Sequence, residues 1–272
     1  MTGKTLRRNL AGLAFAMAAM VLVPAAARAD QLDDIMKAGV IRISTDFAIP
    51  PAGMMNEAMQ PVGSDVETAT LLAKDWGLKL DWVPTTGSTR IPNLLTGKAD
   101  IVVSTLSVTP ERGKVIDFSR AYTVLQSVLG GTAAEKATDV AGLRGKSVGV
   151  TRGTTQDNRL SPLAGPNGFV LHRYEDDATM VTAAATGQES LIATSVALVD
   201  AVKAKVPAAG FAPKFVLDNF DIAVGLRKNE PRLKAKLDEW VLANLQNGKL
   251  NAIYKKYYGV DLPASMQPPE VR

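Results

Sequence analysis

The sequence predicts an α/β protein built from two lobes. Apolar runs of strand length alternate with helical patterns along the chain, which is typical of α/β folds. The alternation occurs as two successive units, and no linker rich in Pro, Gly or Ser separates them. After a leader of 29 residues, about 243 residues remain, enough for two domains of ordinary size. We therefore expect two α/β units packed directly against each other.

The first 29 residues are typical of a secretory signal peptide and are not expected to belong to the fold. Three basic residues (Lys4, Arg7 and Arg8) precede an apolar run over Leu10–Val23, and Ala27-Arg28-Ala29 is a small-x-small cleavage site. The apolar run of fourteen residues is short for a membrane span. The sequence predicts secretion, with cleavage after Ala29.

Residues 30–130 contain the first unit. The expected helices are 31–37, 64–76 and 91–95, and the expected strands are 40–44, 78–83, 99–103 and 122–130. Gly39, Gly77 and Gly97 follow the helices, because glycine readily adopts the left-handed conformation that ends a helix. The run from Ser64 to Glu67 has the pattern of a capping box, so we expect both side chains to bond the first backbone amides.

A second unit of the same kind follows, and the chain then ends in two helices. Strands are expected at 146–150, 170–174, 191–194, 215–217 and 221–226, and helices from 153 onward and at 177–186, 196–205, 231–246 and 250–258. Asn229 is the expected cap of the long helix that begins at Pro231. The Gly130-Gly131-Thr132 region offers a hinge.

The loop from Ser104 to Arg112 is the most informative stretch of the chain. A strand runs directly into it, and Thr109-Pro110 starts a helix with Arg112 in the first turn. Ligands of open α/β sheets bind at such strand ends, and hydroxyls, free amides and a guanidinium together suit a carboxylate. The alternative is a capped helix with a solvated arginine, and these nine residues alone favour neither interpretation.

Composition excludes several classes of function. The leader carries four of the 31 Lys and Arg residues and none of the 27 Asp and Glu, which leaves 27 of each. The basic balance of the whole chain is therefore no signal for nucleic acid or an anionic membrane. The chain has no cysteine and a single histidine, His172, which excludes thiol chemistry, His-based triads and multi-His metal sites. We expect neither a metal nor a cofactor.

Several short motifs occur in order over nearly all of the chain after the leader. They are Gly39–Asp46, Gly63–Glu67, Arg90–Asp100, Ser107–Arg112, Gly145–Thr155, Ile222–Lys228 and Gly248–Gly259. Each motif alone is weak evidence. Together, in this order and spacing, they resemble the periplasmic amino-acid-binding proteins of ABC importers, the family 3 solute-binding proteins.

The resemblance implies a type II periplasmic-binding-protein fold, in which two lobes joined by two crossing strands enclose a ligand cleft. The first lobe would comprise residues 30–130 and 221–272, and the second lobe residues 131–220, with crossings near Gly130-Gly131 and Phe220-Asp221. The resemblance also implies a periplasmic receptor that binds a small carboxylate-bearing solute, a polar or acidic amino acid, by lobe closure. Such a receptor delivers the solute to an ABC permease in the inner membrane. We expect a monomer that binds no nucleic acid.

The positions of several residues within the family motifs imply which of them bind the carboxylate end of the ligand. Arg112 would grip the α-carboxylate, and a bidentate guanidinium suits that task. Thr105 and Ser107 would bond the same end of the ligand, and Thr154 and Thr155 would offer backbone amides from the other lobe. For Thr155 the alternative role is simple N-capping, and both roles can hold together.

Two further residues fall at cleft positions of the family. Asp46 ends the first strand, and the alternative is an aspartate that only caps a loop. Arg90 lies in Ser88-Thr89-Arg90-Ile91-Pro92, a pattern similar to the branch that binds acidic amino acids, where this arginine meets a second carboxylate. The alternative for Arg90 is a surface arginine at a helix start.

Two departures from the family bear on the ligand. Ser195 stands where the family has the aspartate that pairs with the α-ammonium, a loss of roughly 2–5 kcal/mol if no neighbour compensates. Asp46 and Glu189 are the nearby acidic residues that are candidates to pair with the α-ammonium in place of this aspartate. Ile49 and Ala52 occupy the usual aromatic positions of the first cleft loop.

Two other functions stay open at this point. One is an enzyme on the same scaffold, similar to cyclohexadienyl dehydratases, and the other is a receptor for a carboxylate that has no ammonium group. No carboxylate pair with general-acid character stands out in the cleft motifs. We therefore expect a receptor that performs no covalent chemistry, and not an enzyme.

Overall fold

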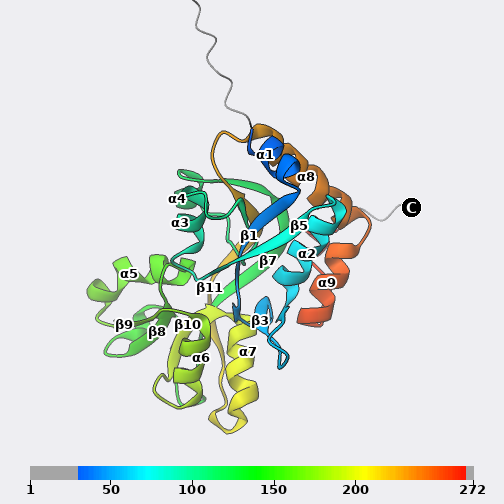
Figure 1. Cartoon of the computed structure of the whole chain (residues 1–272). Helices are drawn as coiled ribbons and strands as arrows, with labels where there is room; N and C mark the ends of the chain where they lie inside the picture. The colour runs from blue at the N-terminus through cyan, green and yellow to red at the C-terminus, as the bar shows by residue number, and fades with distance from the viewer. Residues whose placement is uncertain (1–29, 268–272) are drawn as a thin grey trace, which may run out of the picture.

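The computed structural model of the chain describes residues 30–267. The predicted signal peptide, its cleavage site after Ala29 and residues 268–272 lie outside the described residues. Figure 1 shows two lobes, with helices packed around a central sheet in each. Within residues 30–267, no helix is both long and apolar enough to cross a bilayer.

The elements follow the predicted alternation, except for three short strands between residues 48 and 62 that the sequence analysis did not predict. The helices are α1 (Gln31–Ala38), α2 (Ser64–Asp75), α3 (Arg90–Leu95), α4 (Pro110–Gly113), α5 (Thr155–Asn167), α6 (Asp177–Ala185), α7 (Val196–Lys205), α8 (Pro231–Gln246) and α9 (Lys249–Tyr258). The strands are β1 (Val40–Asp46), β2 (Ala48–Ile49), β3 (Gly53–Met55), β4 (Pro61–Val62), β5 (Lys79–Thr85), β6 (Ile101–Val102), β7 (Asp117–Gly131), β8 (Ser147–Thr151), β9 (Val170–Tyr174), β10 (Leu191–Ser195) and β11 (Ala212–Leu226).

One eight-stranded sheet passes through both lobes in the order β5-β1-β6-β11-β7-β10-β8-β9. The first lobe contains α1 to α4, β1 to β6, α8 and α9, and the second lobe contains α5 to α7 and β8 to β10. The long antiparallel strands β7 and β11 run through both lobes (Figure 1). They are the two strands expected to join the lobes, and β11 is one continuous strand where the sequence predicted two short ones.

The strand pairing bears on where the crossings fall. Gly130 and Gly131 pair with Ile192 and Leu191 of β10, so they already belong to the sheet of the second lobe. Residues 124–126 pair only with residues 219–221 of β11, between the regions where β6 and β10 attach. We propose that the first crossing lies at 124–126, directly opposite the crossing expected near Phe220-Asp221. The domain limits at 130 and 220 stay predictions.

Each lobe has its own hydrophobic core on both faces of the sheet. In the first lobe, Ile41 and Ile43 of β1 pack with residues of α1, α2, α8 and α9, while Val102 packs on the other face with Leu94 of α3. In the second lobe, Ile192 faces α6 and α7, and its neighbours Leu191 and Ala193 face α5. Successive side chains of a strand point to opposite faces, so one strand supplies both layers.

Two predicted helix caps are wrong. The N-cap of α2 is Gly63, and Ser64 lies inside the helix, where its hydroxyl contacts the hydroxyl of Tyr258 at 3.3 Å. The carboxylate of Glu67 accepts a hydrogen bond from the hydroxyl of Tyr257 at 2.6 Å instead of closing a capping box. Packing against α9 therefore replaces the local cap.

The cap expected from Asn229 is also absent, because Glu230 occupies the N-cap position of α8 and makes no side-chain cap bond. Asp30 replaces it. Its carboxylate accepts from the backbone amide of Leu32 in α1 at 3.0 Å and from that of Arg232 in α8 at 2.8 Å. One carboxylate thus caps two helices that are about 200 residues apart in sequence.

Candidate functional site

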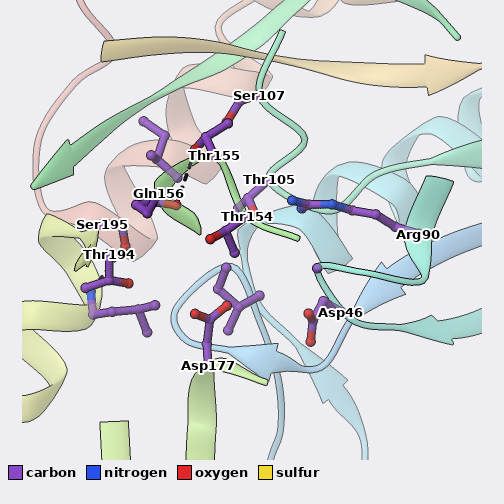
Figure 2. A pocket seen from close by; sticks show the side chains of 14 residues that line it. Asp46, Arg90, Thr105, Ser107, Thr154, Thr155, Gln156, Asp177, Thr194 and Ser195 are labelled. Atoms are coloured by element: carbon purple, nitrogen blue, oxygen red, sulfur yellow. Dashed lines mark hydrogen bonds between the residues drawn. The ribbon is translucent and has the colours of Figure 1, made fainter. Parts of the chain in front are cut away.

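A cavity between the lobes brings together most of the predicted site residues. Seven of the eight line it: Asp46, Arg90, Thr105, Ser107, Thr154, Thr155 and Ser195 (Figure 2). The other lining residues are Ile49, Gly87, Leu125, Gln156, Asp177, Thr194 and Leu198. The eighth predicted residue, Arg112, is buried next to the cavity and contacts Ser107.

The loop after β6 is held in an unusual conformation at the cavity. Thr105 has a positive φ of 42°, which a β-branched residue rarely adopts. Its backbone amide donates to the carboxylate of Asp65 at 2.6 Å, and the hydroxyl of Tyr122 donates to the other oxygen at 2.7 Å. Burial raises the pKa of Asp65 to about 6. Backbone strain of this kind concentrates at binding sites, where surrounding contacts hold it in place.

The helix start after this loop agrees with the sequence. Thr109 is the N-cap of α4, and its hydroxyl accepts the backbone amide of Arg112 at 3.2 Å. Asp65, by contrast, was recognised only as a member of a motif and of a capping box. Its role in holding Thr105 depends on a contact across 40 residues, which no local pattern contains.

Two arginines of the first lobe are buried and have no carboxylate partner among residues 30–267. Arg90 and Arg112 each expose 6% of their surface, so the surface and solvated alternatives for them are wrong. A guanidinium nitrogen of Arg112 donates to the Ser107 carbonyl at 2.9 Å, and another donates to the Gly153 carbonyl of the second lobe at 3.3 Å. Burial lowers the pKa of Arg112 to about 9, with the charge of Arg90 as a second cause.

Arg90 has spare hydrogen-bonding capacity at the cavity. Its Nη1 donates to the Ser104 carbonyl at 2.6 Å, while its buried Nε has no partner among the described residues. Burial also lowers the pKa of this guanidinium. Within residues 30–267, neither Arg90 nor Arg112 forms an ion pair. Buried charges are normally paired, so both groups fit an anion that enters the cavity.

Two buried carboxylates also line the cavity, one from each lobe. Asp46 ends β1, and its Oδ1 accepts the backbone amide of Ala48 at 2.8 Å, so it does cap its loop while facing the cavity. Asp177 is the first residue of α6, and its Oδ1 accepts the hydroxyl of Thr151 at 2.6 Å. Burial raises the pKa of Asp177 to about 7, and the negative charge of Asp46 adds to the shift.

Asp177 was missed as a site residue from the sequence, which marked it only as a helix start. The available signal was its position three residues after β9, since strand ends of a parallel sheet meet at one edge. Glu189 is not near the ligand space. It is fully buried and accepts from the Tyr174 hydroxyl at 2.7 Å, with Nδ1 of His172 also 2.7 Å away. Glu189 therefore cannot take the place of the ammonium-binding aspartate that the family resemblance predicts at position 195.

The second lobe presents the starts of three helices to the cavity. Thr154 caps α5 and Ser195 caps α7, each by accepting a backbone amide at 3.3 Å, and Asp177 begins α6. Helix starts carry unpaired amides and a partial positive charge, which favours an anionic ligand group. The capping role of Ser195 shows that its hydroxyl already has a structural use.

Comparison with known proteins agrees with this arrangement. Residues 41–260 match the pattern of the bacterial extracellular solute-binding proteins, family 3. The chain belongs to this family. Membership makes it a solute-binding protein of the kind that serves ABC transporters in amino-acid transport, and signal peptides and a periplasmic location are typical of the family.

The chain is similar to receptors for different amino acids. It is 27% identical to the L-arginine-binding protein of Pseudomonas aeruginosa over 234 residues, which is 83% of this chain and 90% of the relative. It is 28% identical to the L-cystine-binding protein TcyJ of Escherichia coli over 264 residues, which is 94% of this chain and 97% of the relative.

A solved structure confirms the predicted two-lobe fold. The crystal structure of AncCDT-1, an ancestral amino acid-binding protein and precursor of cyclohexadienyl dehydratase, superposes with a TM-score of 0.75 at 29% identity. The match covers 84% of this chain and 99% of that chain. The fold and family predicted from the motifs are therefore correct, and the ligand has to be argued from the cavity.

Proposed function

We propose that this protein is a periplasmic receptor that binds an amino acid between its lobes and delivers it to an ABC permease. The observation that carries the proposal is the pair of buried arginines, Arg90 and Arg112, which have no carboxylate partner within the described chain. A buried guanidinium is stabilised by a planar anion that it can grip with two hydrogen bonds. A ligand carboxylate is such an anion.

The groups around Arg112 support the same end of the ligand. Ser107, Thr105 and Thr155 line the cavity beside it, and α5 begins there with free backbone amides. Arg112 also contacts the Gly153 carbonyl of the second lobe, so the residue that meets the carboxylate spans the cleft. In this arrangement, ligand binding and lobe closure strengthen each other.

Secretion to the periplasm and action as a monomer belong to the same proposal. The predicted signal peptide supports export, and the similar proteins named above are binding proteins for arginine and cystine. No covalent step is part of the proposed function, which consists of binding, closure and release to the permease.

A thermal-unfolding screen of the mature chain tests this function. The ligands are the twenty standard amino acids, L-cystine, L-ornithine and succinate, the last as a carboxylate without ammonium. A ligand present at 100 times its Kd adds about 2.7 kcal/mol of stability, a shift of several degrees in Tm for a chain of this size. We expect at least one amino acid to raise Tm, and a screen in which only succinate does so would contradict the amino-acid assignment.

One observation keeps an enzymatic alternative testable. Asp177 is a buried carboxyl whose pKa is raised to about 7, which is the property of a general acid that works near neutral pH. The solved relative is itself a precursor of a cyclohexadienyl dehydratase. We propose a receptor and not an enzyme. Incubation with a cyclohexadienyl carboxylate, followed by NMR, checks this, and aromatised product formed at an enzymatic rate would contradict it.

A further inference from the structure

The start of α1 is tied to the start of α8, far from the cavity, where two distant segments of the first lobe lie side by side (Figure 1). The carboxylate of Asp30 accepts backbone amides from both helices, as described above. The backbone amide of the next residue, Gln31, donates to Oε2 of Glu230 at 2.6 Å. The backbone around residue 30 is therefore held against α8 by two carboxylates.

Glu230 is a buried carboxylate that lacks a cation in the described chain. It is 9% exposed, and no lysine, arginine or histidine of residues 30–267 lies within 4.0 Å of it. From the same residues its carboxylate accepts a single hydrogen bond, that of the Gln31 amide. Burying a carboxylate costs free energy unless a cation or several donors compensate it. Glu230 can therefore hold a further positive group.

The charged groups around this contact carry an excess of negative charge. The cations on α1, α8 and β1 are paired or distant: Arg232 with Asp33, Lys234 with Asp238, Arg42 with Asp100, and Lys37 in the last turn of α1. Among residues 30–267, the acids here without a cation are Asp30, Asp34 and Glu230. The starts of α1 and α8 add a positive charge of about half a unit each, which offsets only part of the excess.

Removal of the predicted signal peptide creates a cation at this position. Hydrolysis of the bond between Ala29 and Asp30 adds water, and it leaves a carboxylate on Ala29 and an ammonium group on Asp30. The backbone nitrogens of adjacent residues lie at most about 3.7 Å apart. Since the Gln31 nitrogen is 2.6 Å from Oε2 of Glu230, the Asp30 nitrogen lies within about 6 Å of that oxygen. At such a distance an opposite charge stabilises the ammonium.

We infer that the mature chain binds its own N-terminal ammonium group at Glu230, in an ion pair that joins α1 to α8. The precursor lacks this pair, because its residue 30 carries an uncharged amide at the same place. The first lobe therefore gains the stability of the pair only after the leader has been removed. The inference is independent of the ligand, and it rests on the predicted cleavage after Ala29.

Thermal unfolding of two chains tests the ion pair. One is the mature chain with a free amine on Asp30, and the other is the same chain preceded by two alanines, which moves the ammonium about 7 Å along the chain. At pH 6.5 we expect the Tm of the mature chain to be higher by about 2–4 °C. Glu230→Gln should remove most of this difference. The matched control Glu239→Gln changes an exposed carboxylate of the same helix and should leave the difference unchanged.

The Tm difference should also depend on pH. An α-amino group has a pKa of about 8 in an unfolded chain, and the carboxylates around Asp30 should raise this pKa in the folded protein. The stabilisation is then fully present below about pH 8, and it is lost as the pH rises through the folded pKa. We therefore expect the Tm difference between the two chains to be smaller at pH 10.5 than at pH 6.5.

The outcomes bear on this inference and leave the proposed function untouched. Equal Tm values of the two chains at pH 6.5, or a difference that persists in Glu230→Gln, would overturn the ion pair. A periplasmic chain whose intact mass shows a start other than Asp30 would also overturn it. If Glu230→Gln does not fold, the two parent chains decide, because a Tm difference that stays constant from pH 6.5 to 10.5 cannot come from the ammonium.

Discussion

The two lobes contribute different kinds of groups to the same cavity. The first lobe supplies most of the charge, through Arg90, Arg112 and Asp46, together with the loop at Thr105 whose conformation Asp65 holds. The second lobe supplies three helix starts, at α5, α6 and α7, and one ionisable side chain, Asp177. We therefore expect the first lobe to select the charged groups of the ligand and the second lobe to complete the site with backbone amides.

The comparison makes Arg112→Ala the change with the largest expected effect. In the proposed binding mode, the variant leaves the ligand carboxylate without its main cation, and it removes the contacts with the carbonyls of Ser107 and Gly153. We expect binding to weaken by about 2–5 kcal/mol, which amounts to loss of detectable binding for most ligands. Calorimetry measures the loss, and circular dichroism checks that the chain stays folded.

Arg120→Ala is the control for this change, because Arg120 is an exposed arginine of the same lobe. It should bind like the parent. Near-normal affinity of Arg112→Ala would mean that the first lobe does not define the ligand through this residue.

Gly87→Ala tests closure without touching a charged group. A Cβ at Gly87 would lie 2.8 Å from the backbone oxygen of Arg152 in the second lobe and 3.3 Å from the Thr154 side chain. The clash exists only when the lobes are closed, so we expect ligand affinity to fall by about 2 kcal/mol, roughly thirtyfold. The Tm of the unliganded protein should not change, because no contact within a lobe is altered.

The matched control for closure is Gly165→Ala in α5, where an added Cβ would meet nothing within 4 Å. Small-angle scattering with saturating ligand should show a more open Gly87→Ala protein than the control. Equal radii of gyration and equal affinities would mean that the approach of Gly87 to Arg152 across the cleft is not needed for ligand binding.

Ser195→Asp supplies the ammonium-binding acid that the family resemblance predicts at this position of the second lobe. Aspartate is as good an N-cap as serine, so α7 should remain intact. Binding of at least one standard α-amino acid should improve tenfold or more, about 1.4 kcal/mol, because its ammonium gains a carboxylate partner. Ligands without an ammonium, such as succinate, should bind more weakly. Harm to a ligand that the parent already binds tightly would show that the ammonium lies elsewhere.

Asp177→Asn should have the smallest effect, and it acts on the unliganded protein. Burial raises the pKa of Asp177 to about 7 from 3.8, so ionising this carboxyl opposes folding. The loss of stability is absent below about pH 4 and complete above about pH 7. The charges of Asp46 and Asp176 increase it, and Arg90 reduces it.

At pH 8 we therefore expect Asp177→Asn to be more stable than the parent by about 1 kcal/mol, with the difference shrinking as the pH falls to 5. Urea unfolding at both pH values measures the difference. A variant that is less stable at pH 8 would mean that the Asp177 carboxylate is paired in the unliganded protein.

Local patterns in the sequence were sufficient for the order of the main elements and for part of the site, but they did not predict the short strands β2, β3 and β4. The alternation of apolar runs and helix signals located β9 and α7 to the residue, because strand and helix periodicity depends on near neighbours. The cap at Thr109 was correct for the same reason, since its hydroxyl bonds an amide three residues away. The capping role considered for Thr155 belongs instead to its neighbour Thr154, and Thr155 is the first residue of α5. The strand end at Ser104–Arg112 was recognisable because its residues are contiguous.

Tertiary structure alone decided the features that join distant segments. Asp65 holds Thr105 across 40 residues, Asp30 caps α8 across about 200, and α9 takes the Glu67 carboxylate that a capping box would have used. Asp177 enters the cavity only because the second lobe places the start of α6 opposite the end of β1. A cap or a strand is fixed by hydrogen bonds and burial within a few residues. The charge balance of a cavity is set by packing between lobes, which no local pattern records.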